Sequence, residues 1–228
     1  MIVNISGLKG SGKDVIARSI SEEIREIYKE RNKYRDSEYP VAAMRTVRYS
    51  GWLKNLFMEF FQPVQNLDLE DQDIKNSPAK NYVPHVNDLV KKTYMFKDRM
   101  NPTVRELLIY LSDAVHEEFN PWFLTINRIT EAFATPYAKD CIVFLPDCRL
   151  REEHMHVTKW IESIGGIEYT VRIERPGVHL EPHCHRTEHE VYSIPYDVLY
   201  LNDKDKDSQE HKDEIRKIVK SILKVLEN

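Results

Sequence analysis

The sequence predicts an α/β fold in which a mainly parallel sheet is flanked by helices. Strand-like segments alternate with helical segments along the 228-residue chain, and this alternation implies parallel strands joined by right-handed crossovers. Residues 1–6 and 141–145 are largely apolar, as expected of parallel strands that are covered on both faces. A glycine-rich segment connects the first of these strands to an amphipathic helix, which is the third observation in favour of this fold class.

Residues 7–14 read Gly-Leu-Lys-Gly-Ser-Gly-Lys-Asp and fit the phosphate-binding pattern Gly-x-x-x-x-Gly-Lys-[Ser/Thr] at every position but the last. Glycines let the backbone wrap closely around phosphates, because no Cβ blocks the approach or disfavours positive φ. The amides then point inward at the positive end of the following helix, and Lys13 can reach the β- and γ-phosphates. The residues expected to bind a nucleotide are Gly7, Gly10, Ser11, Gly12, Lys13 and Asp14.

Asp14 stands where the pattern has serine or threonine, whose hydroxyl normally binds Mg²⁺. A carboxylate at this position can still hold the ion, directly or through water. It can equally stabilise the N-terminus of the helix, where negative charge is favoured. Both interpretations remain open on the sequence.

The elements expected in the first 140 residues are a helix over 13–31, a strand over 40–44, a helix over 51–61, a loop or mobile insertion over 62–84, and helices that begin near 103 and 121. Isoleucines recur at helical spacing from Ile16 to Ile27, which defines the buried stripe of the first helix. Thr103 and Glu106 have the spacing of a capping box. Pro121 suits the first turn of a helix.

The elements expected in the remainder are a strand over 141–145, a helix that ends at 165–166, strands over 169–173 and 198–201, and a final helix through 215–226. Gly165-Gly166 is a typical helix stop, and Ile215, Ile218 and Ile222 define a helical stripe. In open parallel sheets ligands bind beyond the carboxyl ends of the strands. The glycine loop and residues 146–149 both lie at that edge, so we expect the site there.

The composition is that of an ordinary globular protein, and it excludes several classes. A net charge of −4 argues against a dominant nucleic-acid-binding surface. No apolar run reaches the roughly 18 residues that a membrane span needs, and the N-terminus enters a strand at once, so we expect neither a membrane anchor nor a signal peptide. Three scattered cysteines do not form a disulfide framework, which favours a reducing cytoplasm.

Further charged residues follow the predicted strands. Asp147 can hold Mg²⁺ or its waters or bind a substrate hydroxyl, and Arg149 can bind a phosphate bidentately; alternatively, the two form a surface pair. Arg105 at a helix start suggests an anionic partner, or a surface pair with Glu106 or another acid.

Two arginines, Arg172 and Arg175, flank the end of the strand over 169–173 and can stabilise a phosphoryl group in transfer. Arg175 is the stronger candidate, because it abuts a Pro-Gly turn, and Arg186 is a weaker one. A cluster of histidines and one cysteine between 179 and 189 suggests either a structural metal or, as its position fits better, a polar lid over nucleotide phosphates.

Taken in order, these motifs resemble the deoxynucleoside monophosphate kinases of tailed bacteriophages, a branch of the P-loop nucleoside monophosphate kinase fold. The aspartate that ends the glycine loop is itself typical of that group. The other segments that carry the resemblance are Leu53-Lys54, Val104-Arg105-x-Leu107, Leu111 with Asp113, Asn120 with Trp122, Pro146-Asp147-x-Arg149, Arg175-Pro176-Gly177, His185-x-Thr187-Glu188 and Asn202-Asp203. The segment 62–100 matches least well.

The resemblance implies one kinase domain over residues 1–228, with a monophosphate-binding insertion at about 45–100 and a lid at about 176–196. It implies transfer of the γ-phosphate of ATP to the 5′-phosphate of a deoxynucleoside monophosphate, with Mg²⁺, for which Asp14 and Asp147 are the candidate ligands. The residues implied in catalysis are Lys13, Asp147, Arg149 and Arg175, and Asn202 joins the ATP-binding set. The residues implied in binding the acceptor are Lys54, Arg105, Trp122, Asp147, Arg149, His185 and Glu188.

Other interpretations remain. Kinases for phosphomevalonate have a similar loop, so the acceptor can be another small phosphate. A nucleotide-binding module without an acceptor is a further class, although the sequence lacks an Asn-Lys-x-Asp motif for guanine. The expected partners are small-molecule nucleotides, and neither nucleic acid nor membrane; related kinases also occur as homodimers, so a second copy of the chain is a further candidate. A phage origin would place the protein in the host cytoplasm.

Overall fold

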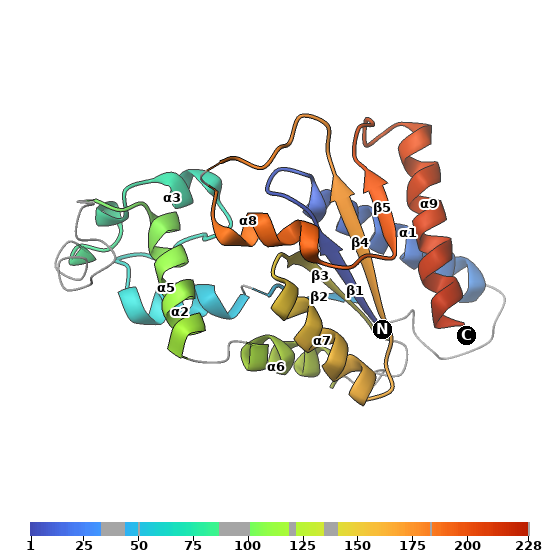
Figure 1. Cartoon of the computed structure of the whole chain (residues 1–228), viewed down its shortest axis with the longest axis horizontal. Coiled ribbons are helices and arrows are strands. Elements are labelled where there is room, and N and C mark those ends of the chain that lie inside the picture. The colour runs from blue at the N-terminus through green and yellow to red at the C-terminus, as the bar shows by residue number, and fades with distance from the viewer. Residues whose placement is uncertain are drawn as a thin grey trace. The chain divides into compact units, whose positions relative to one another are not determined.

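The computed structural model describes residues 1–32, 44–49, 51–86, 101–118, 122–134, 141–182 and 184–227. Within these residues five strands form one sheet, in the order β2-β3-β1-β4-β5 (Figure 1). The strands are β1 (Ile2–Ser6), β2 (Met44–Thr46), β3 (Ile142–Cys148), β4 (Glu168–Glu174) and β5 (Val198–Leu201). Every neighbouring pair is parallel, which confirms the predicted α/β fold class.

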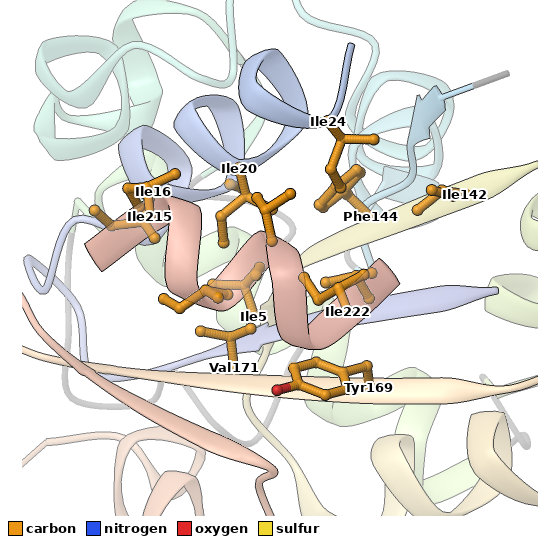
Figure 2. Close-up of a cluster of buried hydrophobic side chains, with 14 of the residues drawn as sticks. Ile5, Ile16, Ile20, Ile24, Ile142, Phe144, Tyr169, Val171, Ile215 and Ile222 are labelled. Atoms are coloured by element: carbon orange, nitrogen blue, oxygen red, sulfur yellow. The ribbon is translucent and has the colours of Figure 1, made fainter. Parts of the chain in front are cut away.

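Helices cover both faces of the sheet. The helices that accompany it are α1 (Lys13–Asn32), α6 (Trp122–Phe133), α7 (Arg151–Ser163), α8 (Arg186–Glu190), the 3₁₀ turn η4 (Val191–Ser193) and α9 (Gln209–Leu226). On one face, α1 and α9 pack together over the strands, where Ile16 and Ile222 meet Ile5 (Figure 2). On the other face, Ile161 of α7 packs against Ile2 and Val143. Successive residues of β1 therefore enter different cores, which is why its sequence is apolar throughout.

Strand β3 continues three residues beyond its predicted end at 145. The register between β1 and β3 shifts between Asn4 and Ser6, so that Asn4 pairs with Leu145 and Ser6 pairs with Cys148. Pro146 lies at this irregularity, and bulges are among the places where strands tolerate proline. The extension brings Asp147 into the strand rather than after it.

Residues Ser50–Thr125 form a second compact unit with its own core. Its elements are α2 (Gly51–Phe61), α3 (Gln72–Asn76), the 3₁₀ turn η1 (Ala79–Asn81) and α5 (Val104–Glu118). The capping box at the start of α5 is confirmed, because Glu106 accepts a hydrogen bond from the Thr103 amide at 2.8 Å and its own amide donates to the Thr103 hydroxyl.

The segment over 62–84 differs from the loop predicted by its acidic sequence. It contains α3 and η1, and Leu67, Leu69 and Val83 are buried against α2 and α5. Asp71 caps α3 by accepting hydrogen bonds from two amides. A few apolar side chains among the acidic residues are enough to fix the conformation of the segment, because they pack against the apolar faces of α2 and α5.

Two predicted boundaries fall partly outside the described residues. The strand predicted over 40–44 is described only as Met44–Thr46, and α6 is described from Trp122, one residue after Pro121. Of the helices that the structure describes, none combines the length and the apolar character that crossing a bilayer requires.

Candidate functional site

The glycine loop lies between β1 and α1 and adopts a conformation that requires its glycines. Gly7, Gly10 and Gly12 have φ of 149°, 84° and 94°, a region that residues with a Cβ rarely adopt. A Cβ on Gly7 would overlap the carbonyl oxygen of Ile173, and one on Gly12 would overlap the side-chain amide of Asn202. The loop is therefore shaped by the ends of β4 and β5 as well as by its own sequence.

Asn202, the residue after β5, connects the glycine loop to the end of β4 by hydrogen bonds. Its side-chain amide donates to the Ser11 carbonyl at 2.7 Å, and its backbone amide donates to the Glu174 carbonyl at 2.7 Å. This side chain thus shapes the glycine loop. The resemblance assigned it to ATP binding, and this contact offers an indirect way for it to contribute.

Lys13 is folded back onto its own loop. Its Nζ donates to the carbonyls of Gly7 and Leu8, both at 2.7 Å, and the residue is buried. Burial, and next the nearby Arg149 guanidinium, lower the pKa of Lys13 to about 8, although Glu188 and two aspartates oppose this effect. Phosphate oxygens entering the loop would replace the two carbonyls as hydrogen-bond acceptors for the Lys13 ammonium group, which already lies in the loop.

Asp14 forms an ion pair that the sequence did not indicate. Its carboxylate accepts a hydrogen bond from Arg48 at 2.9 Å, and Arg48 follows β2. The side chain of Asp14 is also 61% exposed, so one carboxylate can serve the helix N-terminus, the arginine and a cation. Asp14 and Asp147 both interact electrostatically with Lys13, and carboxylate oxygens are donors that suit Mg²⁺.

Asp147 and Arg149 each contact a group that is distant in the sequence. One carboxylate oxygen of Asp147 accepts the Tyr49 amide at 2.8 Å. Arg149 donates instead to the carboxylate of Glu188, whose other oxygen accepts the Lys9 amide of the glycine loop at 2.7 Å. The structure thus brings Lys13, Asp147, Arg149 and Glu188 together at the carboxyl edge of the sheet.

Glu153 is a site-adjacent acid that sequence reasoning missed. Burial, followed by the nearby charge of Asp147, raises the pKa of Glu153 to about 8. Its carboxyl group accepts the Leu150 amide at 3.3 Å at the start of α7. No capping-box signal marks it in the sequence, because the N-cap residue Leu150 has no side-chain acceptor and only the bond from its amide to Glu153 forms.

The two arginines of β4 and the turn after it have different surroundings. Arg172 is buried, donates to the carbonyls of Val191 (2.8 Å) and Ile194, and lies 4.5 Å from the ring centroid of Tyr196. Arg175 is exposed and lines a cavity of about 220 Å³ that also reaches Gly7 and Ser11 of the loop. Arg172, which lines the same cavity, therefore also anchors the segment after α8, whereas Arg175 is exposed beside the loop.

The remaining candidates on the acceptor side, Lys54, Arg105 and Trp122, belong to the second unit. Lys54 pairs with Glu70, and Trp122 stacks edge-on to His116 with ring centroids 5.0 Å apart. Arg105 donates to the side-chain oxygens of Asn76 (3.1 Å) and Gln72 (2.6 Å) rather than to Glu106. Neutral amides hold its guanidinium without cancelling its charge.

The segment rich in histidine, at 179–189, contains no metal-binding group among the residues that the structure describes, and His183 lies outside them. His185 instead caps α8, because its Nδ1 accepts the Thr187 amide at 3.4 Å. Arg186, at the start of α8, is exposed. In the described residues this segment is thus irregular up to His185 and continues into the short helix α8 beside the loop.

Comparison with known proteins adds solved structures only, because no protein-family model and no curated protein matches the chain. A variant of the Mycobacterium tuberculosis APS kinase CysC has 10% identity and a TM-score of 0.40, over 100% of this chain and 96% of that chain. Chaetomium thermophilum Kti12 in complex with ADP-AlF3 has 12% identity and a TM-score of 0.39, over 98% of both chains. Thymidylate kinase from Ehrlichia chaffeensis has 14% identity and a TM-score of 0.37, over 99% of this chain and 98% of that chain. Likenesses this weak identify no substrate.

Proposed function

We propose that this protein is a phosphotransferase that moves the γ-phosphate of ATP to the 5′-phosphate of a nucleoside monophosphate, with deoxynucleotides as the preferred acceptors. The observation that carries the proposal is the glycine loop between β1 and α1, with buried Lys13 at its centre and Arg149 bound at its edge. Inward-pointing amides, a lysine and an arginine are the groups that phosphoryl transfer uses.

On the donor side, the amides of residues 7–14 and Lys13 would hold the phosphates of ATP. Asp14 and Asp147 would hold Mg²⁺, which neutralises charge on the phosphate oxygens when it is bound. Arg175 lines the cavity beside the loop, which supports a contact between its guanidinium and the donor. These side chains orient the phosphates and stabilise charge, which accounts for most of the catalysis in reactions of this class.

On the acceptor side, Arg149 would bind the monophosphate or the phosphoryl group in transfer, because a guanidinium suits two phosphate oxygens. The acceptor phosphate is already an anion, so no general base has to remove a proton from it. The resemblance to the phage kinases supports Lys54, Arg105 and Trp122 of the second unit as further acceptor contacts, and His185 and Glu188 as members of the adjoining lid.

The test is a coupled assay of ADP release with ATP and Mg²⁺, in which each deoxy- and ribonucleoside monophosphate is added separately. We expect stimulation by one or a few deoxynucleotides. Lys13→Ala should lower kcat by at least about a hundredfold, because one charge-assisted contact to the transferred group is lost, whereas Lys220→Ala on the exposed face of α9 is the matched control. ATP turnover that no monophosphate stimulates would contradict the proposed acceptor class.

A further inference from the structure

The carboxylate of Glu188 occupies a position at the glycine loop that suits an anion from outside the chain. Its Oε2 accepts the Lys9 amide at 2.7 Å and its Oε1 accepts the Arg149 guanidinium. Only 13% of the Glu188 side chain is exposed, so the carboxylate is largely withdrawn from water. Lys9 is 179 residues from Glu188 and Arg149 is 39 residues from it, so this contact is tertiary rather than local.

Both donors to this carboxylate are groups that bind phosphate. Lys9 is the third residue of the phosphate-binding pattern, and loop amides of this kind form the anion-binding nest. An arginine that donates to two oxygens is the usual partner of phosphate and carboxylate alike. One carboxylate that bridges a loop amide and an arginine therefore satisfies the donors that a phosphate group would otherwise satisfy.

The lysine of the loop also interacts with groups of the chain itself. Lys13 donates its hydrogen bonds to the carbonyls of Gly7 and Leu8, and Glu188 is the carboxylate that most strongly opposes the lowering of its pKa. A phosphate at the Lys9 amide would meet the negative charge of Glu188 directly. The two anions cannot occupy the same donors, so binding of one requires departure of the other.

The surroundings of α8 permit such a departure. Arg172 holds the carbonyls of Val191 and Ile194, which follow α8, so the C-terminal end of this segment stays anchored to β4. The contacts of Glu188 hold the helix itself against the loop. Glu190, two residues further on, accepts a long hydrogen bond of 3.4 Å from the Arg151 amide at the surface.

We propose that Glu188 holds the place of a nucleotide phosphate in the ligand-free protein and is displaced when the nucleotide binds. The contact keeps the Lys9 amide and Arg149 arranged for an anion, and it makes α8 an autoinhibitory element that competes with the ligand. The inference rests on the proposed function for the nature of that ligand. It adds that nucleotide binding and release of α8 are one coupled step.

The test compares full-length wild type, Glu188→Gln and the matched control Glu190→Gln by isothermal titration with inorganic tripolyphosphate and with ATP. Glutamine keeps the size of the side chain but removes the competing charge. We expect Glu188→Gln to bind both probes about tenfold more tightly, the affinity equivalent of one charge-assisted hydrogen bond, and Glu190→Gln to bind as wild type does. Equal or weaker binding by Glu188→Gln overturns the inference.

A second readout separates displacement from a general change of charge. In the absence of ligand, the ¹⁵N–¹H resonance of Lys9 should differ between wild type and Glu188→Gln. In the presence of saturating tripolyphosphate the two resonances should coincide, because the side chain at position 188 has left this amide in both proteins. Resonances that remain separate would place Glu188 at the loop in the bound state and overturn the inference.

The outcomes also distinguish this inference from the proposed function. Wild type that binds ATP and phosphorylates a monophosphate, but whose affinity is unchanged in Glu188→Gln, refutes the competition and leaves the kinase intact. Tighter tripolyphosphate binding by Glu188→Gln without any monophosphate-dependent turnover supports the competition and refutes the kinase. If neither protein binds either probe, both proposals are refuted.

Discussion

Replacing Gly12 with alanine should damage the loop in two separable ways. The new Cβ would sit at φ 94° and overlap the side-chain amide of Asn202. A left-handed conformation costs a residue with a Cβ about 1–2 kcal/mol. The overlap would also break the 2.7 Å hydrogen bond from Asn202 to the Ser11 carbonyl, which contributes about 1 kcal/mol. Together these effects predict a loss of about 2–3 kcal/mol in the free energy of unfolding.

Gly165→Ala is the matched control, because Gly165 has φ 71° but no neighbouring atom within 4 Å of the place that a Cβ would take. It carries the conformational cost without the overlap, and alanine also restricts the unfolded chain, so we expect a loss of about 1 kcal/mol. Urea unfolding followed by circular dichroism measures both variants. The difference between them reports the contact with Asn202.

A double-mutant cycle with Asn202→Ala makes the reasoning refutable. Asn202→Ala alone should cost about 1 kcal/mol, the contribution of its hydrogen bond to the loop. In Gly12→Ala/Asn202→Ala the overlap is gone, so the double variant should be more stable than the sum of the two single losses predicts. Losses that add would show that Asn202 does not confine Gly12, and β5 would then have no part in shaping the loop at this residue.

Two further predictions concern pH. Burial lowers the pKa of His211, whose Nδ1 lies 2.6 Å from the Tyr200 hydroxyl. The unfolded chain therefore binds the proton more readily, so the free energy of unfolding should fall as pH drops through about 6.5. His211→Asn should flatten this pH dependence in urea titrations between about pH 5.5 and 7.5. Burial and Asp147 raise the pKa of Glu153 to about 8, so the folded protein binds more protons than the unfolded chain and stability should fall as pH rises from about 4.5 to 8. Glu153→Gln should remove that fall. If the free energy of unfolding of Glu153→Gln changes with pH as steeply as that of wild type, Glu153 is ionised in the folded protein and the prediction is wrong.

The order of strands and helices was predictable because the signals for it are local. The apolar run of β1, the glycines after it and the stripe from Ile16 to Ile24 lie within one stretch of about two dozen residues and need no knowledge of distant partners. The same holds for the Thr103–Glu106 capping box. Each of these patterns specifies a conformation through neighbours in sequence.

What the sequence could not supply depends on contacts between distant segments. The extension of β3 through Pro146 follows from a register shift opposite Asn4, and the order of 62–84 follows from a core that α2 and α5 provide. The pairing of Arg149 with Glu188 is of the same kind, since the neighbouring Asp147 was the obvious partner. The burial that raises the pKa of Glu153 also depends on tertiary packing, and Leu150 at the start of α7 gives no capping-box signal for this acid in the sequence.

The charges around Lys13 are balanced within the chain itself. Three basic groups, Lys13, Arg48 and Arg149, meet three carboxylates, those of Asp14, Asp147 and Glu188. The charges of these six side chains balance one another, and a polyphosphate entering the loop would bring excess negative charge. Displacement of Glu188 removes one negative charge, and a divalent cation at the aspartates would offset two more. Under the two proposals the carboxylates near the loop would therefore have two different roles: Glu188 would be exchanged for the ligand, and Asp14 and Asp147 would stay to hold its counter-ion.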